Sequence, residues 1–222
     1  LMGHTDAMEI LLKRKADVDK ASRAGVTPLY AATRNGHTDA MKLLLEHTGD
    51  VNKANNMGRT PLSVAASEGH MDTMVILLAH KADVDKADIK GWTPLFLATQ
   101  SGDVEAMKLL LQYKADVDKA INDGRTPLYI AALMGHTDAM EILLKRKADV
   151  NQASNSGMSP LYAAAKTRRT DAMMLLLAHK ADVNQANEHG GTPLFMAARN
   201  GHTEVMKLLL AHKADVNQAS EQ

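Results

Sequence analysis

Apolar residues recur along the chain in short stretches with the three-to-four-residue spacing of an amphipathic helix. In one stretch Leu29 and Ala32 follow each other at this spacing, and in the next Met41, Leu44 and Leu45 share one helical face. The stretches are too short for long helices. The pattern therefore predicts pairs of short helices, each pair followed by a polar loop.

The residues between the apolar stretches indicate where each helix begins and ends. Thr27 is a good N-cap and Pro28 suits the first helical position, where its missing N–H costs nothing. Asn35-Gly36 predicts a tight turn between the two helices, since helical periodicity resumes directly after it. In the polar loop that follows, Val51 is the expected buried anchor.

This helix–turn–helix pattern repeats with a period of 33 residues, marked by every proline in the chain. The prolines are Pro28, Pro61, Pro94, Pro127, Pro160 and Pro193. The period predicts a partial repeat at 1–21, six full repeats at 22–54, 55–87, 88–120, 121–153, 154–186 and 187–219, and a tail at 220–222. One repeat cannot bury its own apolar face, so the repeats are expected to stack as a single domain over 1–222.

Residues 1–18 are identical to residues 133–150, which indicates a recent duplication or an engineered array. The first repeat lacks its first helix, and the last retains Leu208, Leu209 and Leu210 without polar replacements. Because solenoids normally need polar caps, we expect a fragment of a longer array or a chain that associates end to end.

The amino-acid composition argues against several classes of protein. The absence of cysteine excludes disulfide scaffolds, thiolate zinc sites and cysteine nucleophiles. The balance of 26 acidic and 26 basic residues argues against a general affinity for nucleic acid or anionic membranes. The longest apolar run, 172–178, is too short for membrane insertion, and no signal peptide is visible. Together these features favour a cytoplasmic or nuclear location.

The ten histidines do not predict a metal or catalytic site, because most recur at two repeat positions. Equivalent atoms in adjacent repeats lie about 10 Å apart, too far to share a zinc ion. No catalytic motif or phosphate-binding loop is present, so we expect neither a cofactor nor enzymatic activity. Recurring methionines and aromatic residues are interpreted as packing between repeats, with an exposed aromatic ladder as the alternative.

The repeated Thr-Pro-Leu, Gly-His and Ala-Asp-Val-Asn elements, at a period of 33, resemble the ankyrin repeat over essentially the whole chain. The resemblance implies an all-α solenoid of helix–turn–helix units with β-turn fingers. It also implies a curved stack that binds other proteins through the finger tips and the first helices.

Three features depart from the ankyrin pattern. An aromatic residue, as at Tyr30, often follows Thr-Pro-Leu where the family usually has His. Lysine, as at Lys114, replaces the usual glycine before Ala-Asp-Val, and this left-handed position costs lysine roughly 1 kcal/mol. Arg168-Arg169 replaces Gly-His in one repeat, which calls the geometry of residues 166–170 into question.

Binding residues are expected where the repeats differ from one another, because the scaffold positions are shared. Several variable positions predicted to be exposed carry apolar side chains, with arginines beside them, and Trp and Arg are enriched in binding hot spots. The predicted partner-binding residues are Met57, Arg59, Ile89, Trp92, Arg125, Leu133, Met134 and Met158. Isolated apolar residues are nevertheless common on protein surfaces.

The leading interpretation is a module that binds another protein through its concave surface of fingers and first helices. Two alternatives remain open. The chain could be a targeting or regulatory array of a larger enzyme or channel, or an architectural array without a specific ligand.

Overall fold

The structure is a computed structural model that describes residues 5–218. This part of the chain contains helices and turns and no strand, which confirms the all-α prediction. The chain divides into two compact units, Leu1–Asp116 and Val117–Gln222. We describe each unit by itself, as unit 1 from residue 5 and unit 2 as far as residue 218. The prediction of a single domain stays a prediction, and the predicted tail at 220–222 lies outside the described residues.

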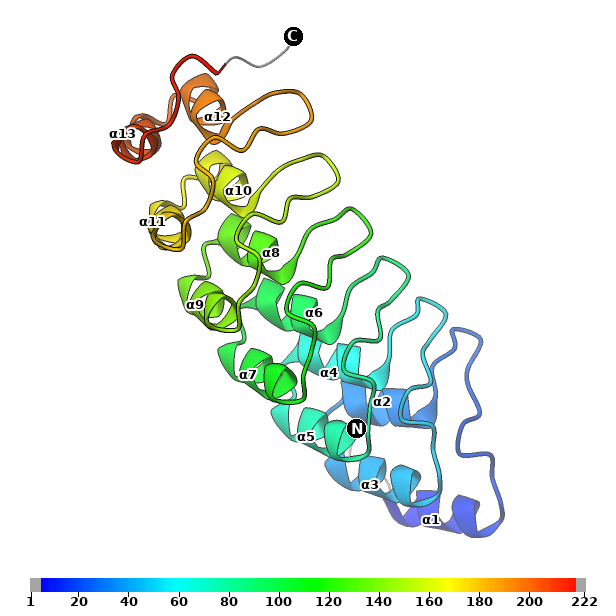
Figure 1. The fold of residues 1–222 in the computed structure, drawn as a ribbon. Helices are drawn as coiled ribbons and strands as arrows, with labels where there is room; N and C mark the ends of the chain where they lie inside the picture. The colour runs from blue at the N-terminus through cyan, green and yellow to red at the C-terminus, as the bar shows by residue number, and fades with distance from the viewer. Residues whose placement is uncertain (1–4, 219–222) are drawn as a thin grey trace. The chain divides into compact units, whose positions relative to one another are not determined.

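Unit 1 is a stack of helix pairs (Figure 1). The first helices of its repeats are α2 (Pro28–Arg34), α4 (Pro61–Glu68) and α6 (Pro94–Ser101). The second helices are α1 (Thr5–Lys13), α3 (Thr38–Glu46), α5 (Met71–Ala79) and α7 (Val104–Gln112). Within the unit, first helices pack on first helices and second helices on second helices.

Unit 2 is built in the same way. Its first helices are α8 (Pro127–Met134), α10 (Pro160–Lys166) and α12 (Pro193–Arg199). Its second helices are α9 (Thr137–Lys145), α11 (Thr170–Ala178) and α13 (Thr203–Ala211). In both units the loops between repeats project on the side of the first helices (Figure 1).

Each first helix begins as the sequence predicts. The hydroxyl of Thr27 accepts a hydrogen bond of 3.1 Å from the Tyr30 N–H, and Pro28 occupies the first turn. The same cap recurs at Thr60, Thr93, Thr126, Ser159 and Thr192. The cap satisfies one of the free N–H groups at each helix start, which helps helices of only seven or eight residues to form.

The turns between helices use left-handed backbone. Gly69 and Gly135 adopt φ values of 72° and 79° between the first and second helices. Arg168 adopts the same conformation at φ 59°, so Arg168-Arg169 preserves the turn in place of Gly-His. After the second helices the predicted left-handed lysines are confirmed, with φ between 62° and 67° at Lys15, Lys81, Lys114, Lys147, Lys180 and Lys213.

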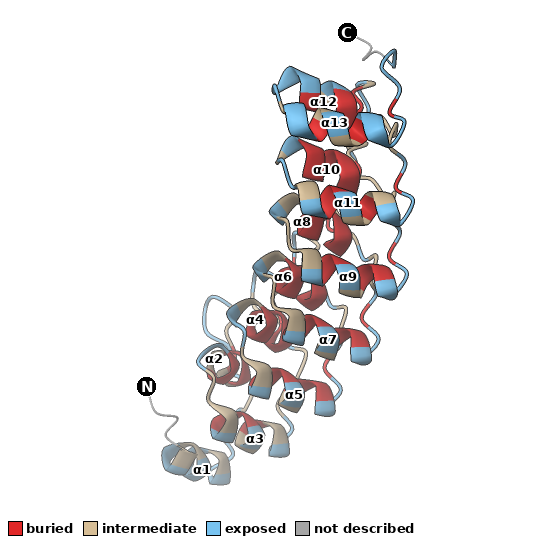
Figure 2. Cartoon of the chain, turned by 90° about the vertical axis from the view of Figure 1, so that its left-hand side faces the viewer, coloured by how far each residue is buried: buried red, intermediate tan, exposed pale blue. Residues whose placement is uncertain are grey.

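The core of each unit lies along its first helices, which are more completely buried than the second helices (Figure 2). Leu62 and Leu95 in unit 1 and Leu161 in unit 2 have no exposed surface. Four aromatic residues that follow the leucine at this repeat position are also buried, at 1–5% exposure, which confirms the packing interpretation for Tyr30, Phe96, Tyr129 and Tyr162. Phe195 is the exception, at 36%.

A ladder of side-chain hydrogen bonds joins the loops of adjacent repeats. In unit 1 the carboxylate of Asp19 accepts from the Asp50 N–H at 3.1 Å, and the amide oxygen of Asn52 accepts from the Asp83 N–H at 2.8 Å. In unit 2, Asn151 accepts from the Asp182 N–H at 2.8 Å. These bonds give the recurring Asp and Asn residues a structural role in ordering the loops.

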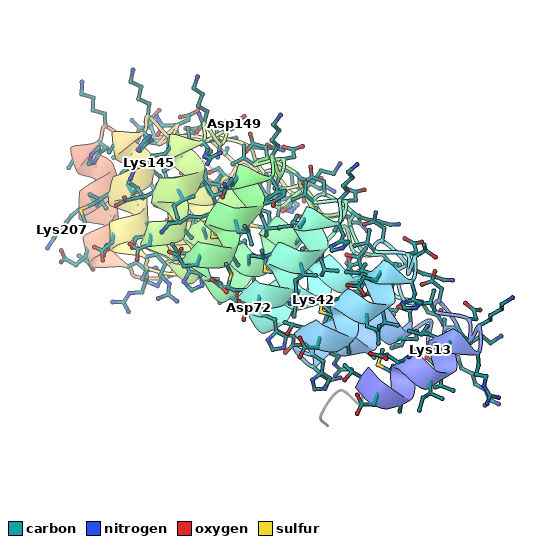
Figure 3. The ribbon with its side chains drawn as sticks, turned by 90° about the horizontal axis from the view of Figure 1, so that it is seen from below. Lys13, Lys42, Asp72, Lys145, Asp149 and Lys207 are labelled. Carbon is teal, nitrogen blue, oxygen red and sulfur yellow. The ribbon has the colours of Figure 1, made fainter. Side chains whose placement is uncertain are left out.

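The second helices carry most of their charge on the outward side. Figure 3 shows Lys42 and Asp72 of unit 1, and Lys145 and Lys207 of unit 2, projecting from the ribbon. Lys145 pairs with Glu141 of its own helix at 3.2 Å. Such exposed pairs add little stability, so this face serves mainly to keep the helices solvated.

Two helices of identical sequence occupy different environments. Helices α1 and α9 both read TDAMEILLK. Leu143 of α9 is fully buried, whereas its counterpart Leu11 of α1 is 58% exposed. In the described residues no helix precedes α1 in its stack, so burial here follows from the neighbours and not from the local sequence.

The strain at the left-handed lysines leads to a prediction about the free energy of unfolding. Lys114→Gly should raise the free energy of unfolding of the chain by about 0.5–1 kcal/mol, because glycine adopts positive φ without strain. Loss of a positive charge near the α7 C-terminus offsets part of the gain. Urea denaturation would measure the change. Lys114→Ala, which keeps the strain, should bring no gain, and equal stability of both variants would contradict the prediction.

Candidate protein-binding surface

The loops between repeats form β-turn fingers, each closed by a hydrogen bond between its ends. The fingers of unit 1 span residues 22–26, 55–59 and 88–92, and those of unit 2 span 121–125, 154–158 and 187–191. In the finger at 55–59, the Asn55 side-chain oxygen accepts from the N–H groups of Met57 and Arg59, at 2.9 and 3.0 Å. This internal bonding fixes the turn and leaves Met57 49% exposed at its tip.

The next finger is fixed in the same way by a carboxylate. Asp88 accepts from the N–H groups of Lys90 and Trp92, at 2.8 and 3.0 Å, and its side chain is only 3% exposed. Ile89 lies at the tip and is 57% exposed. Its N–H donates to the Met57 carbonyl at 3.1 Å, so the two tips lie side by side.

Trp92 is held between charged side chains at the base of its finger. Its ring stacks on Phe96 with centroids 6.0 Å apart, and the cationic groups of Arg59 and Lys90 lie 5.9 and 5.1 Å from its ring centroid. Arg59 also pairs with buried Asp88 at 3.6 Å. These contacts leave Trp92 half-buried, so its predicted exposure is met only in part.

In unit 2, Arg125 pairs with Asp123 of its own finger. The guanidinium contacts both carboxylate oxygens at 2.7–3.0 Å. The hydrogen bond from Arg125 is the main cause that lowers the pKa of Asp123, and the same bond raises the pKa of Arg125. A carboxylate from a binding partner would therefore have to share this guanidinium.

The other predicted residues of unit 2 lie at the end of α8 and on the neighbouring finger. Met134 is 42% exposed. Leu133 is half-buried, and its carbonyl accepts a 3.1 Å hydrogen bond from the Thr167 hydroxyl of the next repeat. Met158 is also half-buried, at the closing position of its finger. Of the six apolar residues expected to be exposed, three are exposed and Trp92, Leu133 and Met158 are half-buried.

The predicted residues thus fall into two groups. Unit 1 brings Met57, Arg59, Ile89 and Trp92 together on two adjacent fingers. Unit 2 carries Arg125, Leu133, Met134 and Met158. That all eight residues form one continuous binding site stays a prediction.

Sequence reasoning missed two surface grooves, one in each unit. The groove of unit 1 has a volume of about 260 Å³ and is lined by Tyr30, Asn55 and Val64 among others. The groove of unit 2 measures about 270 Å³ and has Tyr162, Asn187 and Met196 at the equivalent positions, 132 residues on. The signal was a tyrosine followed 25 residues later by an asparagine.

A larger groove of about 490 Å³ lies at the C-terminal end of unit 2. It is lined by Phe195, Leu210 and Val216 among others, which are 36%, 43% and 69% exposed. At the repeat position of Phe195, Tyr162 is 2% exposed, and at that of Leu210, Leu144 of α9 is 7% exposed and Leu177 of α11 is half-buried. The last described repeat therefore presents an apolar packing face to solvent.

The fingers and paired helices match a family of known proteins. The family model for ankyrin repeats, in three copies, matches residues 1–88, 76–154 and 147–220. The chain is an ankyrin-repeat protein. A comparison with curated proteins found no match. The family match confirms the resemblance and the ankyrin-repeat solenoid fold, and ankyrin repeats are generally non-enzymatic protein–protein interaction modules.

Between residues 5 and 218, no group of three or more His, Asp or Glu side chains is placed to hold a metal ion. Over the same residues, no helix has the length and apolar character needed to cross a membrane.

The Asp123–Arg125 pair predicts a pH effect. Arg125→Ala should raise the pKa of Asp123 towards the usual aspartate value, because the main cause of its lowering is removed. A lowered carboxyl pKa stabilises the fold above the unfolded-state pKa, and this contribution is lost as pH falls through the folded-state pKa. Carboxyl-carbon NMR titration would measure the shift. Arg59→Ala, in unit 1, should leave it unchanged; an unaltered Asp123 pKa in Arg125→Ala would contradict the assignment.

Proposed function

We propose that this ankyrin-repeat protein binds a segment of another protein through its finger tips and the C-terminal ends of its first helices. The observation that carries the proposal is the exposure of large apolar side chains at these places. Met57 and Ile89 lie at adjacent finger tips of unit 1, and Met134 ends a first helix in unit 2. Exposed apolar side chains beside charged groups are the expected composition of a recognition surface.

The fingers are suited to binding because their own hydrogen bonds fix their shape. Asn55 and Asp88 each accept two backbone hydrogen bonds within their fingers. A surface that is ordered before binding loses little conformational entropy when a partner docks. The exposed tips can therefore contribute affinity without a large ordering cost.

The cationic groups around Trp92 support the same surface. Arg59 and Lys90 contact the Trp92 ring, so a partner that covers the ring would also meet two positive charges. Tryptophan and arginine are the side chains most often found in binding hot spots. The centre of the surface in unit 1 is accordingly placed at Trp92.

The proposal is tested by changing exposed apolar residues on the finger side and on the outer side. Ile89→Ser and Met134→Ser should each weaken partner binding by about 1–2 kcal/mol, because each removes an apolar side chain that the bound partner would bury. Val75→Ser and Met174→Ser are matched controls, because these residues are 47% and 50% exposed on second helices. Proteins captured by the unmodified chain would be identified by mass spectrometry and then titrated against all four variants.

A partner that loses affinity with the two finger-side variants and not with the controls supports the surface. If the second-helix variants weaken binding and the finger-side variants do not, the binding face has been placed on the wrong side. Equal affinity of all four variants for the partner would also contradict the proposal.

A second candidate function is end-to-end association of two copies, favoured by the apolar groove at the end of unit 2. Leu210 of that groove is 43% exposed, and Leu11 of α1, in unit 1, is 58% exposed. Both belong to helix positions that pack against neighbouring repeats inside the units. A second copy could cover one of these faces with the other, as an additional repeat would.

Sedimentation equilibrium tests the association. The unmodified chain should show a mass that increases with concentration, and Leu210→Asp should remain monomeric because a charge in the interface is costly to bury. Met174→Asp, an equally exposed site on α11, should associate like the unmodified chain. A monomeric unmodified chain at every concentration would exclude this candidate.

A further inference from the structure

Two grooves, one in each unit, share the same construction. Each contains a tyrosine from a first helix and an asparagine from the following finger, and the asparagine side-chain N–H donates to the tyrosine hydroxyl. The distances are 3.2 Å for Asn55 to Tyr30 and 3.3 Å for Asn187 to Tyr162. The groove volumes are about 260 and 270 Å³. In both units the contributing first helices pack side by side, α2 with α4 and α10 with α12 (Figure 1).

The finger backbone fixes the orientation of each asparagine amide. The Asn55 oxygen accepts from the N–H groups of Met57 and Arg59. The Asn187 oxygen accepts from those of His189 and Gly191, at 3.0 and 2.9 Å. With its oxygen engaged, each amide must present its NH₂ group to the tyrosine, so the tyrosine hydroxyl is the acceptor of that bond.

Each tyrosine hydroxyl therefore has a hydrogen of its own to donate. Among the described residues, no acceptor takes the hydroxyl hydrogen of Tyr30 or Tyr162. Burial raises the pKa of both tyrosines, so the hydroxyls remain protonated donors at neutral pH. A groove hydroxyl that donates to no protein group favours a ligand that brings an acceptor oxygen to it.

Each groove has at least one arginine in its lining. Arg34 and Arg59 line the groove of unit 1, and Arg199 lines that of unit 2. Burial is the largest effect on both tyrosines and keeps their pKa raised. The charges of Arg59 and Arg34 oppose it at Tyr30, where Glu68 adds to it, and the Asn187 hydrogen bond and Arg199 oppose it at Tyr162. In unit 1 the carboxylate of Asp88 is already engaged by Arg59 and two backbone N–H groups, which leaves exposed Glu68 as the remaining acid of the lining.

Apolar side chains also line both grooves. Met57 and Val64 line the groove of unit 1, and Phe195 and Met196 line that of unit 2. A ligand that suits both grooves therefore combines acceptor oxygens with aliphatic surface. Charge-assisted hydrogen bonds are the stronger ones. The arginine and the tyrosine hydroxyl of each groove should therefore bind a carboxylate more strongly than a neutral amide.

We propose that each groove binds the side-chain carboxylate of an acidic residue, flanked by apolar residues, in an extended segment of a partner protein. The carboxylate accepts hydrogen bonds from the tyrosine hydroxyl and the arginine, and the flanking residues pack on the apolar side chains of the lining. This inference rests on the proposed function, for which it names the chemistry of the partner. It also assigns one equivalent site to each unit.

Tyr129 provides an internal control. It occupies the same repeat position as the other two tyrosines, but Ser154 stands where they have an asparagine 25 residues on. No hydrogen bond orients its hydroxyl in the described structure. Removing this hydroxyl should leave both grooves as they are.

The two grooves can be observed separately by NMR of methionine methyl groups, because Met57 lies in one and Met196 in the other. The probes are the peptides acetyl-Leu-Glu-Leu-amide and acetyl-Leu-Gln-Leu-amide, which differ only in the central charge. Both methyl signals should shift with the glutamate peptide, and the glutamine peptide should need about tenfold higher concentrations.

Three variants assign the response to the hydroxyl groups. Tyr30→Phe should weaken the response at Met57 about tenfold and leave Met196 unchanged, and Tyr162→Phe should do the reverse. Tyr129→Phe should alter neither. The remaining methionine signals report whether each variant keeps its fold. Equal responses to both peptides, no response at either methionine, or full responses in the Phe variants would each overturn the proposal.

These outcomes are separate from those that test the proposed function. If the peptides fail while a captured partner still depends on Ile89 and Met134, the groove chemistry is wrong and the binding surface stands. If the peptides bind as expected and no partner depends on Ile89 or Met134, the finger-tip surface is wrong and the grooves stand.

Discussion

The packing of first helix against first helix within each unit is the interaction on which the rest of the structure depends. Leu62 and Leu95 in unit 1, and Leu161 in unit 2, lose all exposure through this packing. Burying a leucine fully is worth about 1.5–3 kcal/mol, far more than an exposed ion pair such as Lys145–Glu141. Because this burial is so favourable, the stack tolerates the backbone strain of a left-handed lysine after nearly every second helix. It also fixes where the fingers emerge, and so where binding can occur.

Most of the fold could be predicted from the sequence because its determinants are local and repeated. Thr27 and Pro28 predict a helix start, and five further copies of the cap in the sequence support that prediction. A single short apolar stretch can belong to a helix or to a strand. Because the pattern occurs six times, the helical spacing can be recognised. The division into two compact units at residue 116 has no such local signal, since the 33-residue period runs through it unchanged.

The candidate binding residues could be predicted less well, because exposure depends on contacts that cross from one repeat to the next. Ile89 and Met57 are exposed as expected, but Trp92 is partly covered by Phe96 and by the cations of Arg59 and Lys90. The tyrosine–asparagine grooves went unnoticed since their partners are 25 residues apart and belong to different repeats. A variable position can be found by comparing the repeats in the sequence. A pair of residues from different repeats can be recognised as one site only in the structure, where the repeats are stacked.

The identical helices α1 and α9 show the limit of any inference made from a short window of sequence. Both read TDAMEILLK, yet Leu11 is largely exposed and Leu143 is fully buried. A substitution that α1 can accept without consequence would remove core packing from α9. In the described structure, the free-energy cost of one and the same substitution is therefore set by the neighbouring repeats of each copy.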